Sequence, residues 1–154
     1  WVEFGIRNGV GTAFENMLNR VKPEKPTCLR YGSHYRHILD YVDSYADPMV
    51  GICWDFGHAN LLKWEQKDAI GFLGDRIKCT HIHNNFGFCD DHSTPDMGNI
   101  DWKSAMSALA ATGFDGPLTL ETHCWYKDYD LFRSFAKHNY ACVSYLERLM
   151  KQEG

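Results

Sequence analysis

Residues 50–55 read Val-Gly-Ile-Cys-Trp-Asp, and this short stretch decides the fold. Bulky Ile52 and Trp54 alternate with a glycine, a cysteine and Asp55. Successive side chains of a β-strand point to opposite faces, so the alternation predicts a strand with one bulky face and one small or polar face. We expect helices to bury the bulky face. The other face then ends, at the C-terminal end of the strand, in a carboxylate.

The same pattern occurs four times along the chain. Each alternating stretch is followed, at some distance, by apolar residues at the three- and four-residue spacing of a helix. Four strand–helix units joined by Pro- and Gly-containing loops predict an α/β fold with four parallel β/α units, in one domain over residues 1–154. The predicted strands are 10–15, 50–55, 77–83 and 117–122, and the predicted helices are 35–45, 65–76, 102–109 and 131–149.

An ionisable residue stands near the C-terminal end of each predicted strand, on the small and polar face: Glu15, Asp55, His83 and Glu121. In a parallel α/β barrel these strand ends converge on the active site. Carboxylates together with an imidazole form a hard oxygen and nitrogen donor set that suits Mn²⁺, Mg²⁺, Co²⁺ or Zn²⁺. Any one of these residues taken alone is as well explained by a surface ion pair, but four at matching places favour a shared site.

Composition narrows the class of protein. The chain has 154 residues, 44% of them hydrophobic and 23% charged, which is typical of a soluble globular domain and not of a disordered chain. Its longest unbroken apolar run, 108–111, is far shorter than the roughly 20 residues that span a bilayer, so we expect no membrane partner. With 16 Lys and Arg against 20 Asp and Glu, and without a basic cluster, we expect no nucleic-acid partner either.

The six cysteines lie far apart and form no Cys-x-x-Cys pair. In a chain large enough to have its own core, this pattern favours reduced thiols, most of them small buried hydrophobes, in a cytoplasmic protein.

Five segments resemble the xylose-isomerase-like barrel superfamily, in particular its sugar isomerase and epimerase branch. They occur in that family's order and at its spacings, over about residues 5 to 125. A single Asp-x-x-His motif is weak evidence, whereas five ordered segments at predicted strand ends are strong evidence. The segments are Gly-Thr-Ala-Phe-Glu15-Asn-Met, Gly-Ile-Cys-Trp-Asp55-Phe-Gly-His58-Ala-Asn, His81-Ile-His83-Asn-Asn-Phe-Gly, Asp90-Asp-His92 and Gly116-Pro-Leu-Thr-Leu-Glu121.

The resemblance implies a metal-dependent isomerase or epimerase of a small sugar, sugar phosphate or polyol. It implies that Glu15, Asp55, His83 and Glu121 hold one divalent ion. It also gives Glu15 and Glu121 the catalytic roles of acid and base on opposite faces of the sugar. A proton leaves the carbon beside a carbonyl and returns to that carbon or its neighbour, and the metal stabilises the enediolate formed between the two steps.

The remaining histidines each admit more than one role. The resemblance assigns His58 to the substrate or to a second metal, while a packing role is about equally plausible. His81 shares a face with His83, and either could bind the metal; we favour His83, at the outer end of the strand, and assign His81 to the substrate. His92, two residues after Asp90, is also assigned to the substrate. The pair is similar to metal ligands in the DNA-repair branch of the superfamily, and a solvated polar loop is about equally plausible.

One departure from the family is large. A full barrel takes about 250 residues and eight β/α units, whereas this sequence predicts four, similar to a C-terminal half. Either the chain is a truncated product, or two copies pair to close a barrel, or it stands as an open sheet with exposed edges that must be covered. Two alternative functions remain: a metal phosphodiesterase similar to an apurinic-site endonuclease, and a non-catalytic, oligomeric half-barrel remnant.

Overall fold

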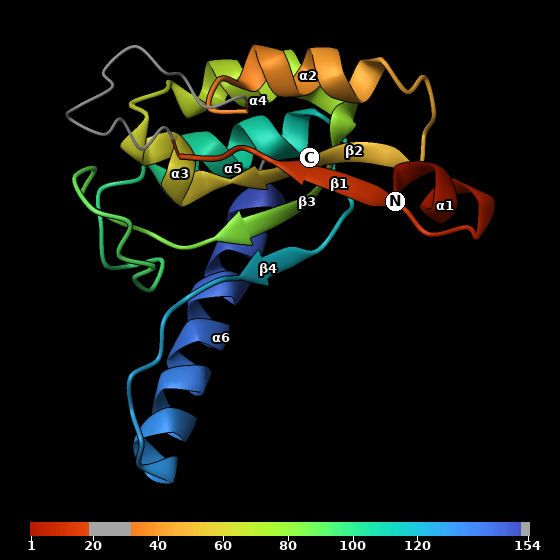
Figure 1. Ribbon diagram of the computed structural model, residues 1–154. Helices are drawn as coiled ribbons and strands as arrows, with labels where there is room; N and C mark the ends of the chain where they lie inside the picture. The colour runs from red at the N-terminus through yellow and green to blue at the C-terminus, as the bar shows by residue number, and fades with distance from the viewer. Residues whose placement is uncertain (19–31, 152–154) are drawn as a thin grey trace, which may run out of the picture.

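The computed structural model describes residues 1–18 and 32–151. Its centre is a four-stranded parallel sheet in the order β1-β2-β3-β4, so that each strand pairs with the next one along the chain (Figure 1). The strands are β1 (Thr12–Glu15), β2 (Val50–Asp55), β3 (Ile77–Ile82) and β4 (Leu118–Leu120). The predicted fold class, an α/β partial barrel of four parallel strands, is confirmed.

Helices follow the strands as the periodicity predicts. The four predicted helices correspond to α2 (Tyr35–Asp43), α4 (Gln66–Leu73) with the 3₁₀ turn η1 (Gly74–Arg76), α5 (Trp102–Ala111) and α6 (Tyr129–Lys151). Two six-residue helices were not predicted, α1 (Val2–Arg7) and α3 (Phe56–Leu61). Helix α3 begins directly where β2 ends, because Asp55 caps it: its Oδ1 accepts a 2.6 Å hydrogen bond from the backbone N–H of His58.

The core lies between one face of the sheet and α2, α4 and α5, which cover that face (Figure 1). Ile52 and Trp54 of β2 are completely buried there, as their alternation predicts. On the outer strands, Ala13 and Thr119 are exposed. The sheet therefore has one covered face and, at least over its outer strands, one open face, which is the arrangement of an opened barrel.

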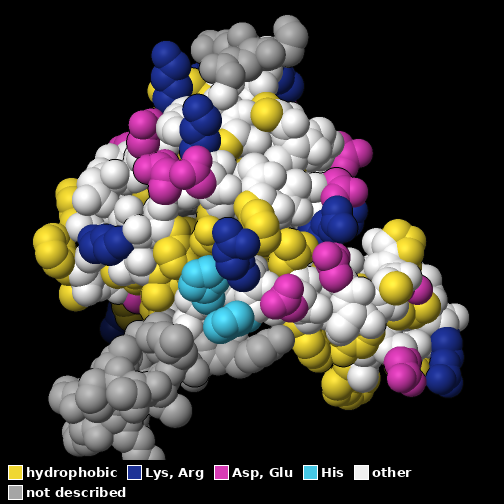
Figure 2. Space-filling view, turned by 90° about the horizontal axis from the view of Figure 1, so that it is seen from above, with side chains coloured by type: hydrophobic (Ala, Val, Ile, Leu, Met, Phe, Trp, Pro, Cys, Tyr) yellow, Lys and Arg dark blue, Asp and Glu magenta, His cyan; other side chains and the backbone are white. Residues whose placement is uncertain are grey.

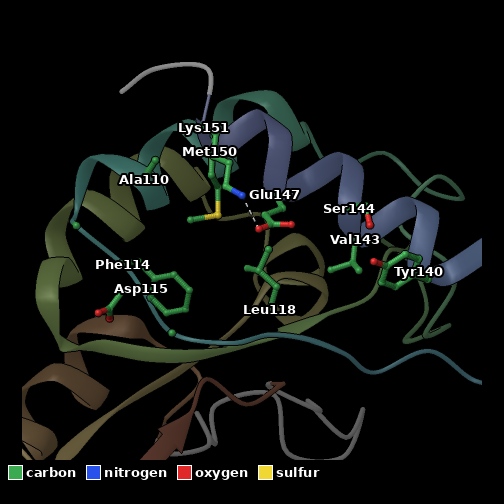
Figure 3. A pocket seen from close by; sticks show the side chains of 12 residues that line it. Ala110, Phe114, Asp115, Leu118, Tyr140, Val143, Ser144, Glu147, Met150 and Lys151 are labelled. Atoms are coloured by element: carbon green, nitrogen blue, oxygen red, sulfur yellow. Dashed lines mark hydrogen bonds and ion pairs between the residues drawn. The ribbon is translucent and has the colours of Figure 1, made fainter.

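Helix α6 extends well beyond β4 (Figure 1). It is anchored by Leu146, which is fully buried, but many of its large apolar side chains are exposed. Between α6 and the stretch leading into β4 lies a groove of about 620 Å³, into which the side chains of Phe114, Leu118 and Met150 project (Figure 3). Within the described residues β1 and β4 each pair on one side only, so both edges of the sheet are open.

The outer surface of the helices that cover the sheet carries charges of both signs. Figure 2 shows Lys and Arg side chains interspersed with Asp and Glu, without a large area of a single sign. No helix in residues 1–18 and 32–151 is long and apolar enough to cross a membrane.

Candidate metal centre

Four side chains converge at the C-terminal edge of the sheet, and we call them the strand-end cluster: Glu15, Asp55, His81 and Glu121. Each offers a ligand atom, and these atoms all lie within 4.8 Å of one another. Nδ1 of His81 is central: it lies 3.5 Å from Oε1 of Glu15, 3.8 Å from Oδ2 of Asp55 and 3.2 Å from Oε2 of Glu121. Each of the four strands thus contributes one donor, at its end or just after it.

The register of the sheet explains this convergence. Asp55 of β2 is the direct partner of His81 in β3, and both side chains leave the sheet on the same face. Asn16, completely buried just after β1, fixes the neighbouring strand end. Its side-chain amide donates to the carbonyl of Asp55 (2.9 Å), and its side-chain oxygen accepts from the N–H of Asp55 (2.7 Å). The backbone of Asp55 is therefore held in place by two hydrogen bonds.

The strand-end cluster meets the requirements of a divalent cation. Nδ1 of His81 and Oε2 of Glu121 are buried atoms without a hydrogen-bond partner. Buried polar atoms are nearly always satisfied by a partner, and a bound ion is one of the standard explanations for an exception. Three carboxylates beside one imidazole are also a donor set that Mn²⁺ and similar ions prefer.

The structure does not bring His83 into the strand-end cluster, although we predicted it as the fourth donor; His81, predicted to contact substrate, occupies that place. Strand β3 ends at Ile82, so His83 already lies outside the regular alternation. Its side chain is completely buried, and its Nε2 lies 3.1 Å from Oδ1 of Asp55, the oxygen that also caps α3. A Cβ on Gly57 would come within 1.9 Å of the His83 ring, so only glycine there leaves room for it.

A second group of donors adjoins the first, and we call it the loop cluster: His58, His83, Asp90 and His92. Its ligand atoms also lie within 4.8 Å of one another. The rings of His83 and His92 stack at 4.0 Å, and His92 stacks in turn on His123 at 4.3 Å. Oδ1 of Asp90 is another buried atom without a hydrogen-bond partner. The structure therefore brings Asp90 and His92 together with His58. This grouping is compatible with a second metal at His58 and with Asp90 and His92 as metal ligands.

His58 links the two clusters. Its Nδ1 lies 3.1 Å from Oε1 of Glu15, and its Nε2 lies 3.7 Å from Oδ2 of Asp90. Burial by itself lowers the pKa of this imidazole, but Asp90, Glu15 and Asp55 outweigh the burial and raise the pKa to about 10. The carboxylates thus create a negative potential strong enough to hold a buried imidazolium. The same potential attracts metal ions.

Described cysteines are all free thiols: Cys53, Cys79, Cys89, Cys124 and Cys142. Cys53 and Cys79 are register partners on β2 and β3, two residues before Asp55 and His81. A hydrogen bond from the Cys53 thiol, together with the charge of His81, lowers the pKa of Cys79 to about 7. The sixth, Cys28, lies outside the described residues.

Comparison with known families decides the relationship of the chain. The model of the xylose isomerase-like TIM barrel family matches residues 2–136. The chain belongs to this family. The match contains all of both clusters, so the resemblance inferred from five short segments is confirmed.

Two curated relatives carry no described activity. An uncharacterized protein of Sinorhizobium fredii, y4fM, is 42% identical over 78 residues, which are 51% of this chain and 25% of the relative. An uncharacterized protein of Methanocaldococcus jannaschii, MJ1311, is 30% identical over 127 residues, which are 78% of this chain and 39% of the relative. The chain thus spans well under half the length of both relatives.

Solved structures share the fold. The structure of an L-ribulose 3-epimerase superposes with a TM-score of 0.74 at 18% identity, over 99% of this chain and 52% of the other. A D-tagatose 3-epimerase-like protein superposes with a TM-score of 0.66 at 24% identity, over 93% of this chain and 51% of the other. The described fold therefore corresponds to about half of these barrels.

Two features of the site were missed from sequence. His123 extends the histidine stack, but it does not stand at a predicted strand end and was therefore not singled out. A signal was present in the sequence, because the Glu-x-His spacing after β4 repeats the His-x-His spacing of β3. Asn16 positions Asp55, and the only sequence signal for this role is that Asn16 directly follows Glu15.

Proposed function

We propose that the chain supplies the metal-binding half of the active site of an isomerase or epimerase that acts on a small sugar, sugar phosphate or polyol. The observation that carries this proposal is the strand-end cluster, in which three carboxylates surround an imidazole nitrogen that lacks a hydrogen-bond partner. Glu15, Asp55, His81 and Glu121 would hold one divalent ion, with Mn²⁺ as the natural first candidate.

When bound, such an ion would supply positive charge that polarises the carbonyl and hydroxyl oxygens of a sugar. The proton transfers fall to the chain's own glutamates. Glu15 is the last residue of β1 and Glu121 comes just after β4, and these are the two outermost strands of the sheet. Their carboxylate oxygens lie 3.5 and 3.2 Å from Nδ1 of His81 and approach it from different sides. Two bases so placed can remove a proton beside a carbonyl on one face of a sugar and return it on the other.

His58 and His92 remain proposed substrate-side residues. His58 lies between Glu15 and Asp90, with its Nδ1 3.1 Å from Oε1 of Glu15, and would orient the Glu15 carboxylate toward a substrate. His92 is only partly buried, its ring stacks on His83, and its Nδ1 lies 2.8 Å from the backbone carbonyl oxygen of Glu121, so it borders the strand-end cluster through that residue.

The names of the structural neighbours favour a ketose as substrate and the third carbon as the position of inversion. L-ribulose and D-tagatose are ketoses, and in both neighbours' names the reaction is a 3-epimerisation. Carbon 3 of a ketose lies beside the carbonyl, and its proton is the one that two opposed carboxylates would exchange.

Exchange of that proton with solvent tests the proposal. The full-length protein loaded with Mn²⁺ is incubated in heavy water with a panel of ketoses, aldoses and their phosphates, and NMR follows deuterium at the carbon beside the carbonyl. We expect incorporation and epimerisation with at least one sugar, and loss of epimerisation in Glu15→Gln and Glu121→Gln. Glu3→Gln, at an exposed glutamate of α1, is the matched control. A filled metal site without incorporation into any sugar would favour the non-catalytic remnant.

A second candidate function rests on the loop cluster. Two adjoining donor groups are suited to more than one metal ion, and clustered metals can act on a phosphodiester, as the apurinic-site endonuclease alternative requires. The formal net charge of −4 does not favour a polyanionic substrate. Manganese titration of the strand-end and loop clusters separates the two functions: one ion bound at these two clusters together supports the isomerase, and two or more ions bound there support the phosphodiesterase.

A further inference from the structure

A third group of metal-type donors lies away from both clusters, where α6 meets the connection between β3 and α5. Helix α6 presents His138 and Cys142, four residues apart and therefore on one face. Asp96 faces them from the connection. Nε2 of His138 lies 3.0 Å from both carboxylate oxygens of Asp96, Sγ of Cys142 lies 3.5 Å from Oδ1 of Asp96, and Sγ lies 3.6 Å from Nε2.

The two separations from sulfur match the edges of a zinc tetrahedron, and the nitrogen–oxygen separation of 3.0 Å would have to widen a little. Typical Zn–N, Zn–O and Zn–S bonds at the tetrahedral angle place nitrogen and oxygen about 3.4 Å apart, and sulfur about 3.6 Å from either. A single ion at the centre of the triangle would therefore reach all three donors with little side-chain movement. We propose that Asp96, His138 and Cys142 form a zinc site that fastens α6 to the β3–α5 connection, and we call it the α6 site.

The surroundings are those of a built site. The hydroxyl of Thr94, a buried residue, donates a 2.7 Å hydrogen bond to Oδ1 of Asp96 and so orients the carboxylate. Outer partners of this kind are common around metal ligands. The side chains of Asp96 and His138 are about half exposed (51% and 50%), which leaves an ion a route in and a water the fourth position. An adjoining pocket of about 290 Å³, lined in part by Trp102 and Tyr145, gives the site a mostly apolar floor.

The donor types select zinc over magnesium or calcium. A thiolate and an imidazole are softer ligands than the oxygens those ions require. The geometry also speaks against a nucleophilic cysteine with an Asp–His pair behind it. In such a triad the carboxylate and the nucleophile contact different ring nitrogens, whereas here Asp96 and Cys142 both contact Nε2 of His138.

A cation here would join residues that lie 42 positions apart in sequence. The connection that carries Asp96 also carries Asp90 and His92, so the ion would tie the loop cluster to the long C-terminal helix. A cross-link that closes a long loop gains stability by removing conformational freedom from the unfolded chain. The α6 site is therefore a structural element beside the active site, with no part in proton transfer.

Cobalt titration of the metal-free, full-length protein tests this proposal, because cobalt substitutes for zinc and reports sulfur ligands. A sulfur-to-cobalt charge-transfer band in the near ultraviolet is expected only from a thiolate ligand, and the strand-end cluster contains none. We expect the band in the parent protein and its loss in Cys142→Ser. Zinc affinity at this site should fall at least about 100-fold in Cys142→Ser and in His138→Ala, since even outer-partner changes cost about 10- to 100-fold. Asp96→Asn should weaken binding while retaining the band at saturating cobalt.

Cys79→Ser is the matched control, because Cys79 and Cys53 are the other closely placed thiols among the described residues. Its band should equal that of the parent. Circular dichroism verifies that each variant is folded, and manganese binding verifies that the strand-end cluster is intact. Absence of a charge-transfer band at saturating cobalt would overturn the proposal, and so would a band that survives in Cys142→Ser but disappears in Cys79→Ser.

Discussion

The choice between His81 and His83 as the metal ligand can be tested by replacing each with glutamine. Nδ1 of His81 lies between 3.2 and 3.8 Å from carboxylate oxygens of all three acidic residues of the strand-end cluster. His83 contacts only one of them, Asp55, at 3.1 Å. His81→Gln therefore removes one of four direct donors. His83→Gln removes an outer partner that orients a single carboxylate.

These roles set the expected magnitudes. Loss of an outer partner typically lowers metal affinity about 10- to 100-fold, or about 1.4 to 2.7 kcal/mol. We expect His83→Gln to fall within this range and His81→Gln to exceed it, with a loss of at least about 100-fold. Glutamine is close enough in size to occupy most of the volume of the buried His83 ring, so both variants should remain folded, which a thermal melt verifies.

Affinity alone does not identify the ligand, so the assay adds a spectroscopic reading. Electron spin echo measurements on the Mn²⁺-loaded protein, at less than one ion per chain, detect a directly bound imidazole nitrogen. The nitrogen modulation should be present in the parent and in His83→Gln, and absent in His81→Gln. The reverse result, with modulation lost only in His83→Gln, would refute the assignment of His81.

Four further predictions follow from the same contacts. Glu121→Gln should weaken Mn²⁺ binding by about tenfold or more, measured by calorimetry, and an unchanged affinity would show that the strand-end cluster is wrongly assigned. Gly57→Ala should lower the free energy of unfolding by about 1–3 kcal/mol in urea titrations, because a new Cβ overlaps the His83 ring. Gly71→Ala, with open space around the new Cβ, should not destabilise the protein. Equal effects of the two substitutions would contradict the packing argument. Asn16→Ala should cost about 1–3 kcal/mol, since two backbone groups of Asp55 lose their partners, and a loss no larger than that of an exposed surface substitution would mean that water replaces those bonds. The chain as numbered should associate in solution, because β1 and β4 have open edges and the α6 groove is apolar; light scattering that gives 17.8 kDa at micromolar concentration counts against this.

The strands, the long helices and the polar face of the sheet could be predicted because each is a local periodic pattern. Alternation of bulky and small residues gave the buried face of β2, and helical spacing gave α2, α5 and α6. The six-residue helices α1 and α3 have too few turns for a period to be recognised. Helix α3 also depends on a single capping contact from Asp55, which only a known strand end would reveal.

The sequence grouped His83, rather than His81, with the other strand-end donors for a related reason. Alternation places His81 and His83 on one face, but it does not show at which residue the strand stops. The register pairs Asp55 with His81, and β3 ends one residue later, at Ile82. Beyond that point the side chain direction is set by the space above Gly57. The α6 site was missed because its donors lie on two elements far apart in sequence, a contact that no local pattern encodes.

Metal binding and turnover are separable in this architecture. All four donors of the strand-end cluster come from the four described strands, and their positions depend on contacts within this sheet, such as those of Asn16 with Asp55. Among the described residues, by contrast, the polar face of the sheet is open over its outer strands, and the epimerase structures that share this fold are about twice as long. A barrel encloses its substrate only when its strands close into a ring, and exclusion of water is what lets a carboxylate act as a strong enough base. The chain as numbered should therefore bind Mn²⁺ with nearly the affinity of a closed barrel, while proton exchange on a sugar should require strands that close the ring, whether from a longer chain or from a second copy.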